Sequence, residues 1–394
     1  MLNRSNWMKK LVFICLPYST LLLCCGVGVA SEGTEEPLIS VTKDGLMGLI
    51  DTSGNLIVPP TYEYILDFHE GLAVVTKRFD GDLKYGYIDQ LGNQKIGCMF
   101  DFADRFSEGL ARVSLNENEG FIDKTGKLVI PCQFSQARSF SDGMATVRDG
   151  RHENGMWGFI DKVGDFVIDF KFQWAHSFSE GLAPVRVGEK WGFIDKLGEI
   201  IVEPTYAEAW EFSNGFARVG TLPIWDINST GCWGFIDKTG KEVVEPRFLH
   251  AGDFKDGLAL VCLDYRWGWI NAKGEFAISP KFDRAEPFSE DLAPVKQNGQ
   301  FGFIDRSGEF VIEPVFQDIK SFSDGLAAVN TRNGRWAYID RTGEEVFDRD
   351  FEDALPFHHG VAEVKIMGKL GIIDRRGKII VEPEYEWPET WIDW

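Results

Sequence analysis

The sequence predicts an all-β fold: a tandem array of ten three-stranded antiparallel meanders with a basic period of 34 residues. The motif "GFID" carries this prediction, because its last residue recurs ten times at spacings of 34 to 42 residues. The ten positions are Asp51, Asp89, Asp123, Asp161, Asp195, Asp237, Asn271, Asp305, Asp340 and Asp374. Composition agrees, since 42 glycines and 16 prolines are spread along the chain and no long stretch has apolar residues at helical spacing.

One repeat, residues 191–219, shows how each element is assigned. "WGFID" alternates as a strand does, and "DKLGE" is a tight turn in which Asp195 accepts backbone hydrogen bonds. "IIVEP" is the return strand, and its proline ends it. The following residues Tyr206, Ala209 and Phe212 are apolar at steps of three, which predicts a compact buried connector rather than a strand. "GFARV", which reads "GLAPV" in other repeats, is the third strand. We call these elements the WGFID strand, the return strand, the connector and the GLAPV strand.

All length variation falls in the hairpin between the GLAPV strand and the next WGFID strand, with the longest insertions after Val75, Val147 and Val219. Insertions at one point of each repeat place these loops on one edge of the assembly, where binding faces are often built. The units stand either as propeller-like blades around an axis or as an open β superhelix. Ten units exceed the 4–8 blades of typical propellers, so the sequence favours the open array.

The first thirty residues have the layout of an export signal. A basic start precedes an apolar run that is too short to span a membrane, and cleavage is expected after Ala30. The alternative is a lipoprotein that begins at Cys24 or Cys25, but neither follows the small residue that such a signal requires. The mature protein is expected in the periplasm, the outer envelope or outside the cell, with no transmembrane helix.

The domain boundaries follow from the signal and the period. They are a signal peptide at 1–30, a spacer at 31–37, ten repeats at 38–386, and a C-terminal cap or tail at 387–394 that covers the open end of the array. The formal net charge is −20, and removal of the signal makes it −23. Such a chain repels phosphate backbones and has no basic stripe, so nucleic acid is not an expected partner.

The recurring motif resembles the unit of the WG-repeat family, also called KWG repeats, which reads roughly K-W-G-F-I-D-x-x-G-x-x-V-I-x-P-x-Y. The resemblance covers about residues 38–386 and implies an all-β bacterial repeat protein, often exported or modular, that serves as an interaction scaffold. The motif residues that carry it are Trp157, Gly158, Trp191, Gly192, Trp233, Gly234, Trp267, Gly268 and Trp336. In the other repeats Met47, Tyr85, Glu119, Phe301 and Leu370 replace the Trp. The Trp is therefore a packing preference and not a reactive group.

No catalytic residue, metal or cofactor is predicted. Ten like aspartates at turn positions are turn formers, whereas acid–base catalysis needs two carboxyls in unlike environments. The six histidines show no metal-ligand spacing and are read as surface or loop residues. Asp80 and Asp82 lack the further ligands that a calcium loop needs. A hydrolase is therefore the least favoured function.

Four cysteines remain in the mature chain, and Cys98 and Cys132 occupy the same place in adjacent repeats. Equivalent residues in one continuous sheet lie about 4.8 Å apart, so a disulfide between them would favour a continuous solenoid. Sheets packed face to face lie about 10 Å apart, which leaves the thiols free. We expect free thiols.

Tryptophans outside the repeat positions are the candidate binding residues. Trp225 lies in the longest inserted loop, and Trp174 and Trp210 lie in connectors. An exposed Trp on a loop edge can stack on a sugar or anchor a protein partner. In the alternative reading, Trp174 and Trp210 pack within their connectors and the three C-terminal tryptophans cap the array.

The favoured function is an exported, non-catalytic scaffold that presents its loop edge to a protein partner. The alternative is a module that binds a cell-envelope glycan or peptidoglycan. For that alternative, Trp225→Ala is expected to abolish sugar retention without unfolding the array.

Overall fold

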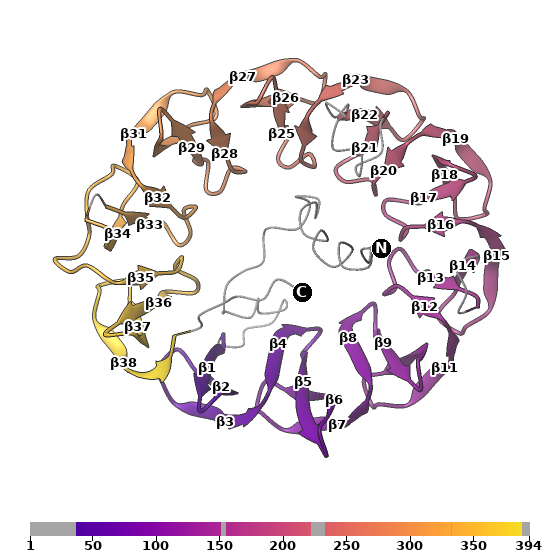
Figure 1. Ribbon diagram of the computed structural model, residues 1–394, viewed down its shortest axis with the longest axis horizontal. Helices are drawn as coiled ribbons and strands as arrows, with labels where there is room; N and C mark the ends of the chain where they lie inside the picture. The colour runs from indigo at the N-terminus through magenta and orange to yellow at the C-terminus, as the bar shows by residue number, and fades with distance from the viewer. Residues whose placement is uncertain (1–36, 151–154, 222–232, 332, 388–394) are drawn as a thin grey trace, which may run out of the picture.

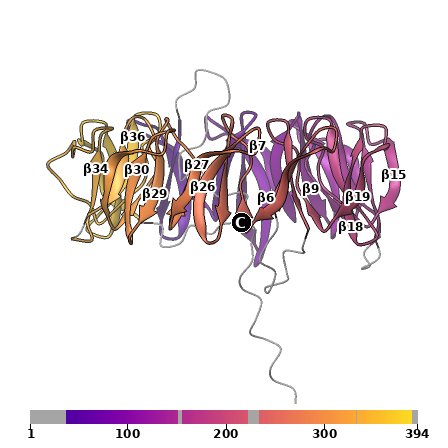
Figure 2. The ribbon, with the colours of Figure 1, turned by 90° about the horizontal axis from the view of Figure 1, so that it is seen from above.

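The computed structural model describes residues 37–150, 155–221, 233–331 and 333–387. In these ranges every regular element is a β-strand. The strands form ten small antiparallel blades around one axis, with the connectors toward the axis and the return strands at the rim (Figure 1). Seen edge-on, the ring is a flat disc whose strands run between its two faces (Figure 2).

The blades are numbered along the chain. Blade 1 has β1 (Ile39–Lys43), β2 (Leu46–Ile50) and β3 (Leu56–Tyr62). Blade 2 has β4 (Tyr64–His69), β5 (Leu72–Phe79), β6 (Asp82–Asp89) and β7 (Gln94–Phe100). Blade 3 has β8 (Phe102–Ser107), β9 (Leu110–Leu115), β10 (Asn118–Asp123) and β11 (Leu128–Phe134). Blade 4 has β12 (Gln136–Ala137), β13 (Ala145–Arg148), β14 (Trp157–Ile160) and β15 (Phe166–Phe172). Blade 5 has β16 (Trp174–Ala175), β17 (Leu182–Val187), β18 (Lys190–Asp195) and β19 (Ile200–Tyr206).

The second half of the ring repeats this plan. Blade 6 has β20 (Glu208–Ala209), β21 (Phe216–Gly220), β22 (Trp233–Asp237) and β23 (Glu242–Phe248). Blade 7 has β24 (His250–Ala251), β25 (Leu258–Leu263), β26 (Arg266–Asn271) and β27 (Phe276–Phe282). Blade 8 has β28 (Arg284–Ala285), β29 (Ala293–Gln297), β30 (Gln300–Ile304) and β31 (Phe310–Phe316). Blade 9 has β32 (Asp318–Ile319), β33 (Ala327–Asn330) and β34 (Trp336–Ile339). Blade 10 has β35 (Asp353–Ala354), β36 (Val361–Ile366), β37 (Lys369–Asp374) and β38 (Ile379–Glu386).

The glycine of "WG" allows the return strand to pass close to the WGFID strand. In blade 5, Trp191 pairs with Tyr206, and the register then shifts around Gly192. A Cβ on Gly192 would lie 2.4 Å from the carbonyl oxygen of Val202. No other residue fits so close an approach, which explains why glycine recurs at this position.

The aspartate that ends the WGFID strand forms the turn, as the sequence predicts. Asp195 Oδ1 accepts the backbone N–H groups of Leu197 and Glu199, each at 2.9 Å, and Gly198 has a φ of +80°. In blade 3 a hydrogen bond from the Thr125 hydroxyl, with backbone N–H groups, lowers the pKa of the equivalent carboxyl. Hydrogen bonds within the turn thus occupy these carboxylates.

The apolar core lies between neighbouring blades. Phe193 on β18 is fully buried and meets Phe212, from the connector of blade 6, edge to face with 5.1 Å between ring centroids. Ala217 and Val219 of the next GLAPV strand belong to the same cluster and are fully buried. The blades therefore hold together through apolar faces that no single blade could bury alone.

The connector contains more β-structure than the sequence suggested. Its apolar residues are buried as predicted, but Glu208 and Ala209 also pair with Gly220 and Val219 as the short strand β20. Most blades therefore have four strands instead of the expected three.

Acidic turns link six blades to the next one along the chain. Glu70, in the turn before β5, accepts the backbone N–H of Gly109 in blade 3 at 3.1 Å and pairs with Lys124 at 3.1 Å. Glu180 likewise accepts the N–H of Gly215 at 3.0 Å and pairs with Lys238 at 2.9 Å. Four further acidic side chains accept the backbone N–H of the corresponding glycine in the next blade. They are Glu108, Asp142, Glu290 and Asp324. We call these contacts the acidic latches.

The ring closes on itself, so the preference for an open array is wrong. Glu386 at the end of β38 pairs with Thr42 of β1, which joins blades 10 and 1 in one sheet. Trp387 is buried in a cluster with Ile39 and Val41 of β1. Trp387 was expected to cap a free end, and it instead fills the seam between the last and first blades. The other residues of that tail lie outside the described ranges.

Cys98 and Cys132 are free thiols, as expected for blades packed face to face. Their sulfur atoms lie 3.9 Å from the carbonyl oxygens of Val75 and Val113, each within its own blade.

Candidate functional site

The repeat tryptophans and glycines are structural. Trp157, Trp191 and Trp336 are buried, and Trp233 and Trp267 are half-buried. A Cβ would lie 2.4–2.6 Å from a return-strand carbonyl at each of the four predicted glycines, Gly158, Gly192, Gly234 and Gly268.

The three candidate binding tryptophans have different surroundings. Trp174 on β16 is 39% exposed, and its ring centroid lies 5.4 Å from that of Trp157 in the preceding blade. Trp210 is half-buried in its connector, with the Arg218 guanidinium 5.3 Å from its ring. Trp225 lies outside the described residues. Of the two that the structure describes, Trp174 lines a pocket.

This pocket has a volume of about 670 Å³ and is lined largely by residues from the connectors of blades 3 to 6. The connector strands of these blades face the axis of the ring (Figure 1). That volume is typical of small-molecule sites, which span about 300–1,000 Å³. Its wall joins Trp157 and Trp174 to the charged side chains Asp104, Arg112, Glu119, Arg138 and Glu211. Serine hydroxyls from three connectors complete it.

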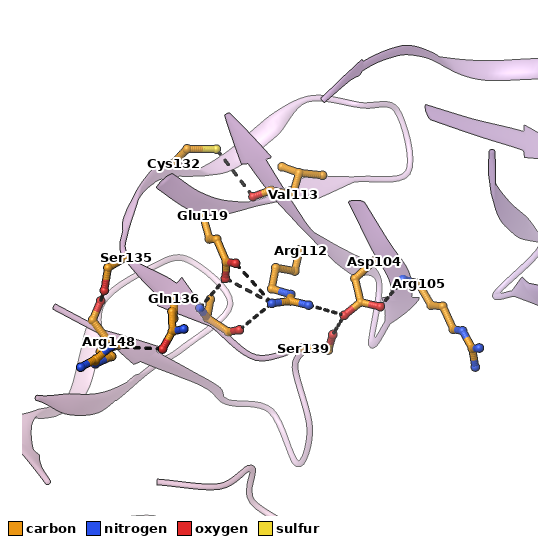
Figure 3. A network of polar contacts seen from close by, with 11 residues as sticks. Asp104, Arg105, Arg112, Val113, Glu119, Cys132, Ser135, Gln136, Ser139 and Arg148 are labelled. Carbon is orange, nitrogen blue, oxygen red and sulfur yellow. Dashed lines mark hydrogen bonds and ion pairs between the residues drawn. The ribbon is translucent and has the colours of Figure 1, made fainter. Parts of the chain in front are cut away.

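Glu119 organises the blade 3 side of the pocket (Figure 3). It stands where five other repeats have Trp, and it pairs with Arg112 at 3.3 Å. Arg112 also binds Asp104 at 3.1 Å and donates to the carbonyl oxygen of Ala137 at 3.0 Å. Ser139 donates to Asp104 at 3.0 Å. The guanidinium thus holds two carboxylates in fixed positions as hydrogen-bond acceptors.

Donors without a partner in the described ranges also line the pocket, chiefly from blade 4. The Arg138 guanidinium lies 5.8 Å from the Trp157 ring, and no carboxylate of the described chain lies within ion-pair distance of it. The Nε atoms of Arg112 and Arg138 and Nε1 of Trp157 are buried without a hydrogen-bond partner among the described residues. Burial lowers the pKa of Arg138 and the nearby Glu211 carboxylate opposes that shift.

Glu211 closes the pocket from blade 6. His176 Nδ1 lies 3.2 Å from its carboxylate, and the His176 ring lies between the rings of Trp191 and Trp210, at 5.0 and 5.5 Å. Burial alone would raise the pKa of Glu211, but the interactions with His176 and Arg138 and a backbone hydrogen bond together outweigh burial, and the pKa is lowered. Glu211 is therefore an ionised acceptor at neutral pH.

A second feature of the same sector lies at the rim. Six apolar side chains on the turns and return strands of blades 4 and 5 are 41–78% exposed. They are Val163, Phe166, Val167, Leu197, Ile200 and Ile201, which we call the outer apolar patch. β15 and β19, which carry four of them, follow one another along the rim (Figure 1). The equivalent positions of blade 6 include the polar residues Thr239 and Glu242.

Sequence reasoning named Trp174 but missed the pocket around it. Glu119 was noted only as a departure from the repeat, although a charged residue at an otherwise aromatic core position is the signal that could have located the site. Within the described ranges no group of three or more His, Cys, Asp or Glu side chains is arranged to hold a metal ion. The same part of the chain contains no helix with the length and apolar character of a membrane span.

The fold and its repeated glycine, aspartate and tryptophan positions define a propeller-like β-repeat protein. The sequence model of the WG containing repeat matches ten segments: 47–78, 85–118, 120–150, 157–191, 191–220, 233–267, 267–300, 301–336, 336–369 and 371–387. The matches cover most of the chain, which therefore belongs to the WG-repeat family. A search of curated proteins finds no match.

Solved structures of similar fold share little sequence with this chain. BamB from Moraxella catarrhalis is 14% identical with a TM-score of 0.33, over 71% of this chain and 87% of BamB. The tricorn protease is 14% identical with a TM-score of 0.25, over 90% of this chain and 39% of the protease. TM-scores this low carry no argument about activity or partners.

Proposed function

We propose that this chain is an exported, non-catalytic scaffold that holds a protein partner outside the cytoplasm. The outer apolar patch carries the proposal. Contiguous exposed apolar surface is costly in water and marks interaction sites on soluble proteins. Because the patch spans two neighbouring blades, it offers a partner a surface that one repeat alone cannot provide.

Two observations support a non-catalytic role. The repeated aspartates use their oxygens in turn hydrogen bonds, as Asp195 does with Leu197 and Glu199. In the pocket, Arg112 forms ion pairs with both Asp104 and Glu119, which favours a fixed binding surface over a pair of carboxyls with distinct acid and base roles.

The proposal is tested by photo-crosslinking in the native host. A photoreactive amino acid at Leu197, which is 78% exposed, is expected to capture one discrete protein. The double variant Val163→Lys, Ile200→Lys should abolish that adduct, because charges at exposed positions disrupt the apolar contact without disturbing the core.

Blade 6 supplies the matched control. The same photoreactive residue at Thr239, which occupies the place of Leu197 in its own turn, should give no adduct, and Thr239→Lys should leave the adduct at Leu197 unchanged. Absence of any adduct at Leu197, or an adduct that survives both lysine substitutions, would refute docking on the patch.

A further inference from the structure

We propose that the pocket among blades 3 to 6 binds a neutral oligosaccharide through its pyranose rings. This site lies on the axis side of the ring, apart from the outer apolar patch, and does not depend on the protein partner proposed above. Its residues combine an exposed aromatic face with fixed hydrogen-bond acceptors and unpaired donors, which is the chemistry that a polyhydroxylated ring requires.

Trp174 provides the aromatic platform. Its partly exposed ring is supported from the preceding blade by Trp157, whose centroid lies 5.4 Å away. A large rigid ring with one apolar face toward a pocket suits stacking against the C–H face of a pyranose. Equivalent connector positions carry Gln136 in blade 4, Glu208 in blade 6 and His250 in blade 7, so Trp174 is a feature of this sector and not of the repeat.

The polar wall matches hydroxyl groups, which both donate and accept hydrogen bonds. Asp104 and Glu119, fixed by Arg112 at 3.1 and 3.3 Å, present acceptors on one side. On the other side Arg138 presents guanidinium donors that no carboxylate of the described residues engages. Glu211 adds a third ionised acceptor.

Charge and backbone geometry disfavour other ligands. The wall carries the three carboxylates Asp104, Glu119 and Glu211 against two guanidiniums, so a strongly anionic ligand would meet repulsion. A peptide added as an extra strand needs a long free edge. The connector strands that border the pocket in blades 4 and 5, β12 and β16, are two residues long, and only β8 in blade 3, with six residues, offers a longer edge.

Glu119 opens the space that the ligand would occupy. Trp is larger than Glu, and blade 6 shows the filled alternative, with Trp233 in the equivalent position beside Arg218. There Arg218 pairs with Asp253 at 2.7 Å and donates to the carbonyl oxygen of Ala251 at 3.0 Å. The fold can thus hold a Trp and an Arg together at these two positions. In blade 3, Glu119 in place of the Trp leaves a polar pocket where blade 6 has packed side chains.

The same geometry favours binding over cleavage. Glycoside hydrolysis needs a carboxylic acid whose pKa is raised enough to protonate the leaving oxygen. Although burial opposes it, the combined interactions with His176, Arg138 and the backbone hold the pKa of Glu211 below its usual value, and Arg112 ion-pairs with both Asp104 and Glu119. The oligosaccharide is therefore expected to be recovered intact.

Isothermal titration of the mature protein with chitotetraose, cellotetraose and xylotetraose tests the proposal. At least one of these should bind, and Trp174→Ala should weaken it about tenfold, as expected for loss of one stacking contact. His250→Ala is the matched control. His250 occupies the equivalent connector position and stacks on Trp267 at 5.7 Å, but lies away from the pocket, so its loss should leave the affinity unchanged.

Glu119→Trp gives a second, independent readout. It restores the residue of the repeat, so the chain should fold with wild-type thermal stability while binding is abolished. Val163→Lys, Ile200→Lys should bind the sugar as the wild type does, which separates this site from the outer apolar patch. Binding to none of the three sugars, or binding that Trp174→Ala and Glu119→Trp leave unchanged, would overturn the proposal.

Discussion

In most WGFID strands, the residue that follows the tryptophan position has no room for a side-chain methyl group. Blade 9 shows the consequence, because it has Ala337 there in place of glycine. Trp336 still pairs with Phe351, and Ile339 with Glu345, but the chain between these two pairs leaves the sheet and forms no return strand.

Gly192→Ala should therefore destabilise the protein by about 2 kcal/mol or more, since its Cβ would meet a carbonyl oxygen at 2.4 Å. Gly371→Ala is the matched control. Its Cβ would lie 3.4 Å from the equivalent carbonyl oxygen, so the cost should stay below about 1 kcal/mol. Chemical denaturation of both variants measures the difference. Equal losses would show that the close approach is not the reason for the glycine.

Glu363 should make the stability depend on pH. Its carboxyl is buried in β36, one oxygen has no hydrogen-bond partner in the described chain, and burial raises its pKa to about 8. The folded state therefore keeps a proton that the unfolded state releases near the ordinary glutamate pKa of 4.5, and the free energy of unfolding falls as the pH rises between these two pKa values.

Glu363→Gln removes this titration, so the variant should be more stable than the wild type by a few kcal/mol at pH 8 and nearly equal to it at pH 4. Thermal unfolding across this range measures the effect. The exposed Glu199→Gln serves as control and should change little at either pH. A constant difference between Glu363→Gln and wild type at all pH values would contradict the assignment.

At the scale of elements, the acidic latches join turns of neighbouring blades. At Glu70, Glu108, Glu180 and Glu290 the latch combines a backbone hydrogen bond with an ion pair, and the two contributions differ. The side chains of Glu180 and Lys238 are 28% and 47% exposed, so water screens their ion pair, whereas the N–H of Gly215 loses its partner entirely if Glu180 is removed.

Glu180→Ala should thus cost about 1 kcal/mol, and Lys238→Met less than about 0.5 kcal/mol. Urea denaturation of the two variants compares them under the same conditions. If Lys238→Met costs as much as Glu180→Ala, the ion pair and not the hydrogen bond holds the latch.

At the scale of the whole molecule, closure depends on the seam between blades 10 and 1. Trp387→Ala should cost about 3 kcal/mol or more, because it leaves a cavity beside Ile39 and Val41. Small-angle X-ray scattering should also show a larger radius of gyration if the ring opens. Trp174→Ala, which removes a partly exposed Trp away from the seam, should change neither quantity much.

Export is tested on the protein isolated from the envelope fraction of its native host. Intact mass spectrometry should give a chain that begins at residue 31. A mass that begins at Cys24 or Cys25 and carries lipid would support the lipoprotein alternative, and an uncleaved chain would argue against export.

The sequence alone determined the three main strands and the turn of the repeat, but not the short fourth strand in the connector. The patterns that carry this prediction are local: the alternation of the strands, the turn formed by the aspartate, and the apolar residues three apart in the connector. Each recurs along the chain, and this repetition made the prediction secure. The sequence also predicted free thiols at Cys98 and Cys132. A disulfide between them would need their strands to be neighbours in one continuous sheet, whereas strands in separate packed blades lie too far apart. The latches were missed, although the "EG" and "DG" turns that carry them recur in the sequence.

Only the tertiary structure decided whether the array closes and where a ligand pocket forms. Closure depends on the small angle between packed blades, summed over ten interfaces, and a repeat motif does not encode that sum. The pocket joins Asp104, Glu119, Trp174 and Glu211, which are separated by up to about a hundred residues and belong to three blades. Their proximity results from the packing of neighbouring blades. The effect of one substitution in a repeat therefore depends on the residues that surround it in the closed ring.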